Sequence, residues 1–383
     1  MQSSNDRSVG PDRLEERPNG LALVVGSEAP KLTCTPLDAE RLRRAKIAFS
    51  CRRVPGEHLR TLLSGDIRPR AGQLVLARID RIRQHGRIER IDGRRAHLFL
   101  GDEVVLVYGN RYASDQFEGL VPTDLGPCHM VAAGGLAARM EVRNRRVKPA
   151  TEITPLGLLG DAEGNPLSLR QYRLESAEPT LGRPMTIAVV GSAMNSGKTT
   201  SAAHLIRGFR RSGVRVGYAK VTGTGAGGDF WKMIDAGADH VVDFTDAGFI
   251  STYKVPLPKV EKILARLVGH LENLGAEVIV LEIADGVFQS ETAGLMRSSV
   301  ARRLVDMYLM AATDALSAES GVRWIEREEL PLLALCGTVN SCPLAVREIE
   351  SQVRVPVLNL PDLRNPDVLC HLLQPRTPQV VGA

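Results

Sequence analysis

Apolar positions in the second half of the chain fall into short continuous runs. MTIAVVG follows Pro184, and VRVGYAKVTG, AEVIVLEIA, VDMYLMAAT, LPLLALCGTV and VPVLNL come after it in that order. Between these runs, amphipathic spacing predicts helices over residues 199–212, 259–275, 315–327 and 343–352. Continuous apolar strands that alternate with helices are buried on both faces of a sheet. The pattern therefore predicts an α/β fold with a parallel sheet.

The first half has a different rhythm. Residues 72–82 (GQLVLARIDRI) alternate between apolar and polar side chains, as a half-buried strand does. Shorter strands are expected at 86–91, in RRAHLFL and in EVVLVYG, because Asp92-Gly93 and Gly101-Asp102 favour tight turns between them. This spacing predicts a smaller β-rich domain, built as an antiparallel barrel or sandwich. Residues 120–182 contain many Gly and Pro, so we expect them to finish that domain irregularly and to contain the linker.

The N-terminal residues complete this division of the chain. Residues 1–20 are polar and charged, which predicts a disordered tail, and Leu21–Gly26 is a candidate first strand. A helix is expected over 38–47 and a helical turn or two within 55–64. The predicted organisation is a tail at 1–20, a β-rich domain with linker at 21–180, and an α/β domain at 181–383.

The strongest chemical signal is VVGSAMNSGKTTSAAHL, which places small residues between a buried strand and a helix. Backbone N–H groups of such a turn and the helix N-terminus form a phosphate site, so the segment predicts a P-loop that binds ATP with Mg²⁺. Lys198 would reach the β- and γ-phosphates, Thr199 would bind Mg²⁺, and Gly197 would allow close approach of the backbone. A chance Gly-Lys-Thr is the alternative, and the flanking strand and helix argue against it. The expected nucleotide contacts are Gly191, Ser192, Asn195, Ser196, Gly197, Lys198, Thr199 and Thr200.

Five residues separate Gly191 from Gly197, and this long loop resembles that of dethiobiotin synthetase. That enzyme belongs to a broad class of P-loop NTPases that includes the cobyrinate amide synthetases. In the family, a strand-end lysine meets the substrate and the transferring phosphate, a later glutamate binds Mg²⁺, and an asparagine lies near the adenine. The resemblance covers about residues 185–360 and implies these roles for Lys220, Glu282 and Asn340.

Position in the chain supports part of this assignment. Lys220 and Glu282 end predicted strands, and ligands of open α/β sheets bind at the carboxyl ends of the strands. Lys198, Lys220 and Mg²⁺ would stabilise charge on a moving phosphoryl group. The expected metal ligands are Thr199 and Glu282 with Asp229 or Asp285, and Asp243 is a further candidate. Solvated loop or cap positions are the alternative for Glu282, and ordinary turns are the alternative for Asp285 and Asn340.

Two further segments have open interpretations. VYGNRYASDQFEG holds Tyr108, Asn110, Arg111, Tyr112 and Asp115, and is either a recognition loop or a tightly packed turn. Arginines crowd residues 78–95 and could face RNA, but no aromatic residue lies there for base stacking. A solvated, salt-bridged surface is therefore favoured over a nucleic-acid site.

These features favour an ATP-dependent enzyme that activates a small acidic or amine substrate by phosphoryl transfer, in the manner of a ligase, synthetase or kinase. The β-rich domain would help to bind the substrate or hold a homodimer. The alternative is a nucleotide switch whose β-rich domain meets a protein or nucleic acid. The six cysteines form no CxxC pair, and no apolar segment has the length of a membrane span, so we expect a cytoplasmic protein without a membrane partner.

Overall fold

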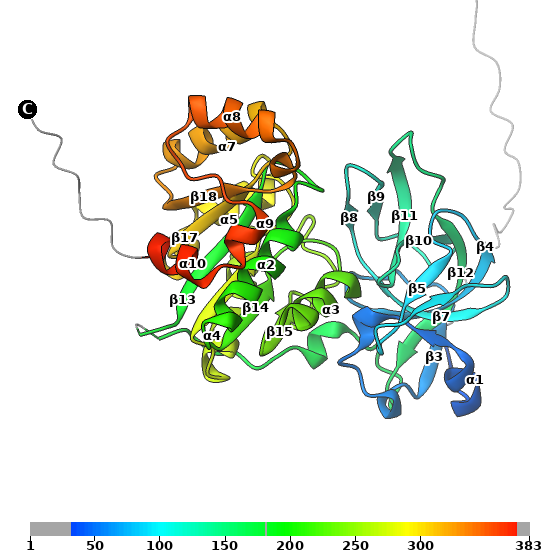
Figure 1. Cartoon of the computed structure of the whole chain (residues 1–383). Coiled ribbons are helices and arrows are strands. Elements are labelled where there is room, and N and C mark those ends of the chain that lie inside the picture. Colours follow the sequence, from blue (N-terminus) through cyan, green and yellow to red (C-terminus); the bar gives the residue numbers. More distant parts are fainter. Residues whose placement is uncertain (1–31, 181, 374–383) are drawn as a thin grey trace, which may run out of the picture. The chain divides into compact units, whose positions relative to one another are not determined.

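The second half of the chain contains the parallel sheet that its apolar runs predict. The structure, a computed structural model, describes residues 32–180 and 182–373, so the predicted tail and the candidate strand Leu21–Gly26 lie outside the described residues. The six strands have the order β15-β14-β16-β13-β17-β18, and all their pairings are parallel (Figure 1). They are β13 (Met185–Gly191), β14 (Val216–Lys220), β15 (His240–Asp243), β16 (Val278–Glu282), β17 (Met307–Ala311) and β18 (Leu332–Cys336).

Helices cover both faces of this sheet, because each strand buries alternate side chains on opposite sides. Ile187 and Val189 of β13 pack in the same apolar cluster as helix α2, whereas Ala188 and Val190 pack in the cluster that holds α4 and α7. The helices are α2 (Lys198–Arg211), α3 (Gly227–Ala236), α4 (Leu257–Asn273), α5 (Ser290–Arg297), α6 (Ser299–Leu304), α7 (Ala315–Arg327), α8 (Pro343–Gln352), α9 (Leu360–Leu363) and α10 (Pro366–Leu373).

The predicted helices are all present, but the last predicted strand is wrong. VPVLNL contributes only one isolated parallel bridge, between Leu335 and Val357. The chain then turns into α9, because the Asn359 side chain caps the helix and Pro361 stands in its first turn. Local capping thus ends the run before it can pair along β18.

The first half forms a ten-stranded sheet and a separate hairpin. Strands β4, β7, β11, β10 and β12 pair in turn, and β12 pairs back with β4, so these five close into a ring. Most pairs are antiparallel, whereas β2 and β11 run parallel to β7. The sheet comprises β1 (Thr33–Pro36), β2 (Lys46–Ile47), β3 (Thr61–Ser64), β4 (Leu74–Arg81), β7 (Glu103–Tyr108), β8 (Arg111–Tyr112), β9 (Phe117–Leu120), β10 (Cys128–Ala132), β11 (Leu136–Arg143) and β12 (Thr151–Gly160), and the hairpin comprises β5 (Arg87–Glu89) and β6 (Arg95–His97).

Two local expectations for this half need correction, and a third, the helical turn within 55–64, is confirmed over only part of its range. Residues 120–182 are not irregular, because they supply β10, β11 and β12 before a short 3-10 helix, η3 (Leu169–Tyr172). Helix α1 (Ala39–Arg44) is shorter than predicted, since the chain enters β2 at Lys46. The segment 55–64 has one 3-10 turn, η2 (Gly56–His58), and then becomes β3 rather than continuing as a helix.

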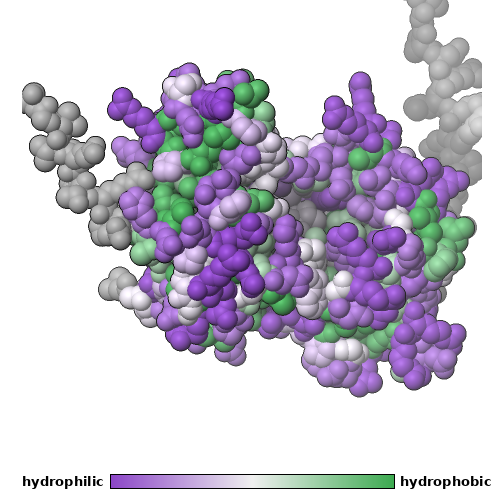
Figure 2. Space-filling model, in the orientation of Figure 1, coloured by the Kyte–Doolittle hydropathy of each residue, from purple (hydrophilic) through white to green (hydrophobic). Residues whose placement is uncertain are grey.

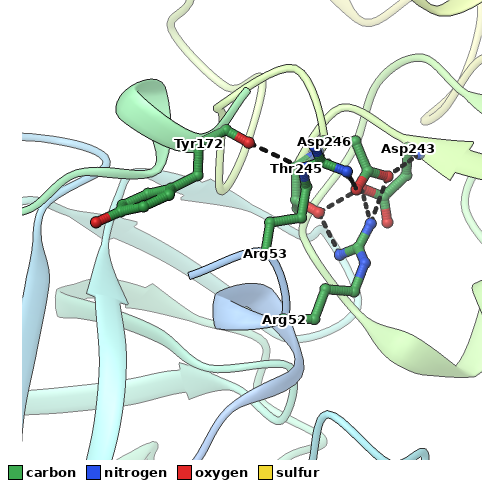
Figure 3. Close-up of polar contacts among 6 residues, drawn as sticks. All are labelled: Arg52, Arg53, Tyr172, Asp243, Thr245 and Asp246. Carbon is green, nitrogen blue, oxygen red and sulfur yellow. Dashed lines mark hydrogen bonds and ion pairs between the residues drawn. The ribbon is translucent and has the colours of Figure 1, made fainter. Parts of the chain in front are cut away.

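Arg52, which follows the 3-10 helix η1 (Phe49–Cys51), links the first half to the parallel sheet (Figure 3). Its guanidinium lies between the carboxylates of Asp243 and Asp246 and donates to the Thr245 hydroxyl. Residues of both halves thereby share one compact unit. Hydrophilic residues cover much of the face shown in Figure 2, with smaller apolar patches between them. No helix within residues 32–180 and 182–373 combines the length and apolar character that a membrane span requires.

Candidate functional site

The predicted phosphate loop lies between the carboxyl end of β13 and the first turn of α2. Gly197 caps α2 with a φ of +100°, a conformation that favours glycine, and Asn195 also has a positive φ of +61°. A Cβ added at Gly197 would lie 3.0 Å from Gly337 Cα, and one at Gly191 would lie 2.3 Å from Ser196 Oγ. Both glycines are therefore required by the tight path of the loop.

The loop also holds polar groups that protein atoms leave unsatisfied. The buried hydroxyls of Ser192 and Ser196 have no hydrogen-bond partner among the described residues. Lys198 is 6% exposed and donates from Nζ to the carbonyl of Ala193 at 2.7 Å, so its ammonium folds back over the loop. Burial lowers the pKa of Lys198, although nearby carboxylates, Glu282 first among them, oppose the shift. These groups fit a phosphate ligand, because its oxygens would accept the unused N–H and O–H donors.

Glu282 is the centre of a buried polar network at the end of β16. It is 1% exposed, and it accepts hydrogen bonds from Thr199 Oγ1 at 3.2 Å and Tyr218 Oη at 3.0 Å. Lys220 Nζ lies 3.2 Å from the same carboxylate. Parallel pairing explains the meeting, since Glu282 is in register with Val189 of β13 and with Lys220 of β14. Thr199 and Glu282 thus bring one hydroxyl and one carboxylate together, a pair that would suit Mg²⁺ if phosphates and water supplied the remaining ligands.

Lys220 is held between two carboxylates rather than standing free. It pairs with Asp229 of α3 as well as with Glu282. Burial alone would lower the pKa of Lys220, but these two carboxylates outweigh that effect and raise the pKa. Burial alone would raise the pKa of Asp229, but the positive charge of Lys220 outweighs that effect and lowers the pKa. Lys220 and Asp229 therefore keep their charges at neutral pH, and with Glu282 they form a fixed polar group beside the loop.

The remaining predicted residues are Asp285, Thr200, Asn340 and Asp243. Asp285 has its pKa raised by burial, and the positive charges of Lys198 and Lys220 oppose the shift. Thr200 accepts a hydrogen bond from Lys232 at 2.8 Å. Asn340 donates from Nδ2 to the carbonyl of Leu358 at 2.6 Å, so its amide serves the fold. Asp243 is committed to Arg52 and Thr245, and no cluster of three or more acidic, His or Cys side chains suited to a metal occurs among the described residues.

A cavity of about 700 Å³ opens beside the loop. Its walls on the side of the parallel sheet include Met194, Lys220 and Asp285. The first half of the chain supplies the opposite wall from strands and loops that are distant in sequence. These residues are Gln84, His85, Gly86, Arg87, Glu89, Arg95, His97, Arg111, Tyr112, Ala113, Gln116, Ala132, Ala133 and Gly134.

Glu89 of that wall and the nearby Asp115 are held by specific contacts. Glu89 is 5% exposed, accepts from the backbone N–H of Gly227 at 2.6 Å, and pairs with Arg95 at 2.8 Å. Asp115 accepts from Asn195 Nδ2 at 2.9 Å, so the turn after β8 contacts the phosphate loop directly. Arg111 and Asp115 belong to the segment whose role the sequence left open. The contact of Glu89 with Gly227 carried no local signal, because the two residues are 138 positions apart.

The fold and loop together define the class of the second half. A parallel sheet, a glycine-containing turn after a central strand and a helix that begins with Lys198-Thr199 make up the α/β fold of P-loop nucleoside triphosphatases. No protein-family model and no curated protein matches the sequence.

Solved structures show partial likenesses. The signal recognition particle receptor FtsY of Elizabethkingia anophelis is 18% identical with a TM-score of 0.35, over 48% of this chain and 60% of that one. The chloroplast FtsY of Physcomitrella patens is 17% identical with a TM-score of 0.31, over 49% and 62% of the two chains. The kinase domain of the Escherichia coli tyrosine kinase ETK is 14% identical with a TM-score of 0.30, over 41% and 67%. The chain spans about three-fifths of the FtsY structures. Such scores do not bear on function, and the resemblance to dethiobiotin synthetase stays a prediction.

Proposed function

We propose that the protein binds Mg·ATP at residues 191–200 and transfers the γ-phosphoryl group to a small molecule held in the adjoining cavity. The observation that carries this proposal is the position of the cavity. Its lining runs from Met194 of the phosphate loop to Lys220 and Asp285 at the strand ends, and then to the opposite wall. A concave, largely preformed space beside a phosphate site suits a metabolite better than a folded partner.

The chemistry would need positioning and neutralisation of charge. The bond between the γ-phosphorus and the bridging oxygen breaks, a bond to an oxygen or nitrogen of the substrate forms, and ADP leaves with the electron pair. Lys198 would bind the phosphates, and Thr199 and Glu282 would hold the metal, whose charge neutralises the phosphate oxygens. Lys220 lines the cavity and is fixed by Asp229 and Glu282, so its ammonium would face the group in transit.

Calorimetry with Mg·ATP, and with Mg·GTP as the competing nucleotide, tests the first step. We expect the Lys198→Ala variant to lose at least about 30-fold in affinity, because a charge-assisted contact to phosphate is removed. Lys262→Ala is the matched control, since Lys262 is exposed on α4. Equal affinity in all three proteins would exclude residues 191–200 as the nucleotide site. Tighter binding of Mg·GTP would replace ATP in the proposal.

A nucleotide-dependent switch is the second candidate, and one contact favours it. The hydrogen bond from Asn195 to Asp115 connects the phosphate loop to the first half of the chain, so occupancy of the loop could alter the surface there. ADP release measured against pools of metabolites and against macromolecular fractions separates the two. Stimulation by a small molecule supports the enzyme, and stimulation only by a macromolecule supports the switch.

A further inference from the structure

Arg111 is a buried cation with unused hydrogen-bonding capacity. It lies on β8, is 6% exposed and lines the cavity beside the phosphate loop. Its Nη2 donates to Gln116 Oε1 at 3.0 Å, whereas its Nε and Nη1 have no partner among the described residues. Burial lowers the pKa of Arg111 to about 10, so the guanidinium is still charged at neutral pH.

This state is unusual, because buried charges in folded proteins are normally paired. Asp115 and then Asp285 are the carboxylates whose charges act on Arg111, and the Oδ1 of Asp115 also lacks a partner although its Oδ2 binds Asn195. No carboxylate of residues 32–180 and 182–373 forms an ion pair with Arg111. The ring of Phe117, 5.7 Å away, offers only a cation–π contact. Within residues 32–180 and 182–373 these N–H groups therefore lack a partner, which leaves them for a ligand.

Of the other charged groups that line the cavity, Arg87 is exposed and Asp285 is a buried carboxylate. Lys220 is paired with Asp229 and Glu282, and Arg95 is paired with Glu89. His85 donates from Nε2 to the carbonyl of Val131 at 3.0 Å, and burial, followed by the charge of Arg111, lowers its pKa to about 4. His85 is thus neutral at physiological pH. Arg111 is the buried cation of this wall that has donors to spare.

We infer that Arg111 anchors the carboxylate of a small anionic substrate in this cavity. The edge of the planar guanidinium that Nη1 and Nη2 form matches a planar carboxylate and can donate to both of its oxygens, because Nη2 has a second N–H besides the one bound to Gln116. The space of about 700 Å³ accommodates a metabolite. The inference deepens the proposed function by naming the substrate class. The binding itself requires no nucleotide, so it can be tested even if the phosphoryl-transfer proposal fails.

The test is thermal unfolding of the full-length protein without nucleotide, at constant ionic strength, with propionate, succinate, inorganic phosphate or chloride. We expect propionate or succinate to raise the Tm of the wild type and the Arg111→Met variant to bind that anion at least about 30-fold more weakly. Arg87→Met is the matched control, because Arg87 lines the same cavity but is exposed. Equal loss in both variants, or no stabilisation of the wild type by either carboxylate, would overturn the inference. Stabilisation through Arg111 by phosphate alone, in a Lys198→Ala background that disables the phosphate loop, would also overturn it.

The ligand-free Tm gives a second, independent readout. An uncompensated buried charge destabilises a fold, so Arg111→Met should unfold at the same temperature as the wild type or higher. If Arg111 instead pairs with Asp115 in solution, the variant would leave that carboxylate unpaired and would unfold several degrees lower. The inference would then be wrong. Calorimetry with Mg·ATP completes the design, since the nucleotide affinity of Arg111→Met should equal that of the wild type. Loss of carboxylate binding with intact nucleotide binding separates this site from the phosphate loop.

Discussion

Replacing Arg52 with methionine tests how strongly the two halves of the chain are held together. The Arg52 side chain is 13% exposed and those of Asp243 and Asp246 are 6% exposed, so the variant would leave two carboxylates in a nearly dry setting (Figure 3). The guanidinium also lies 4.3 Å from the ring centroid of Phe49 and 4.9 Å from that of Phe230. Methionine preserves much of that apolar contact but removes the charge.

Breaking a buried ion pair by removing one partner costs about 3–5 kcal/mol. A chain of this kind has a total stability of about 5–15 kcal/mol, so the loss is a large share of it. Protonation moderates the effect. Burial already raises the pKa of Asp246 to about 6, against the attraction of Arg52. Removal of Arg52 raises that pKa further, so Asp246 takes up a proton more readily in the variant. The destabilisation should therefore be larger at pH 8 than at pH 5.

Urea unfolding of both proteins at pH 5 and pH 8 measures the difference in the free energy of unfolding. Arg53→Met is the control, because the Arg53 side chain is 38% exposed and lies 3.9 Å from Asp246. The ion pair of Arg53 with Asp246 is partly solvated, so Arg53→Met should lower the free energy of unfolding by about 1 kcal/mol or less. An Arg52→Met loss below that value at pH 8, or a loss that grows as the pH falls, would refute the description of a dry, paired cluster.

Four other outcomes follow from the geometry. Glu282→Gln should weaken Mg²⁺-dependent turnover far more than metal-free nucleotide affinity, because the amide lacks the charge that binds a hard cation; equal Mg²⁺ titrations would exclude it as a ligand. Gly197→Ala should lower both nucleotide affinity and stability, because Gly197 has a φ of +100° and a Cβ there would press on Gly337. Gly213 has a φ of +77° but open space around it, so Gly213→Ala should lower only the melting temperature, through backbone strain. Burial lowers the pKa of His85 in the folded protein to about 4, from an ordinary value of 6.5, so between those pH values the folded state binds fewer protons than the unfolded state. The free energy of unfolding should therefore fall by about 3 kcal/mol as the pH drops through this window, and a His85→Asn variant should show a flatter pH profile. A fragment of residues 181–383 should bind Mg·ATP in calorimetry but show no substrate-stimulated ATPase activity, and a folded fragment without nucleotide affinity would contradict the loop assignment.

The parallel sheet was predictable because its signal is local and strong. Each of its longer strands is a continuous apolar run between amphipathic helices. The pattern fails at VPVLNL, where the capped helix α9 follows, and at β15, where the signal is short. β15 contains four residues within an acidic, glycine-rich segment, and nothing in that segment marks it as a strand.

The strands within residues 120–182 were missed because Gly and Pro were interpreted as breakers. In the structure Gly135, with a φ of +104°, forms the turn between β10 and β11. A Cβ at Gly157 of β12 would lie 2.7 Å from the carbonyl oxygen of Leu63, so glycine permits close pairing there. The register also shifts between Pro155 and Gly157, which is the kind of irregularity that accommodates proline in a strand.

The candidate site combines a local feature, the phosphate loop, with contacts between residues that are distant in sequence. The phosphate loop is contiguous in sequence, so residue types and spacing alone predict it. The partnership of Arg52 with Asp243 joins residues 191 positions apart, and that of Glu89 with Gly227 joins residues 138 positions apart. No local pattern specifies such pairs. The sequence therefore offered Asp243 as a metal ligand, although the fold commits it to Arg52.

The segment from Arg111 to Asp115 shows why the two halves cannot be assigned separate tasks. Asp115 holds Asn195 of the phosphate loop, and Arg111, four residues earlier, lines the cavity beside Lys220. Arg111 and Asp285 also come from different halves, yet they are close enough for Asp285 to oppose the lowering of the Arg111 pKa. A boundary near residue 180 separates the two sheets, but side chains from both sides of it build one cavity. We therefore expect the phosphate loop to bind a nucleotide with its own atoms, whereas the cavity exists only when both halves are present.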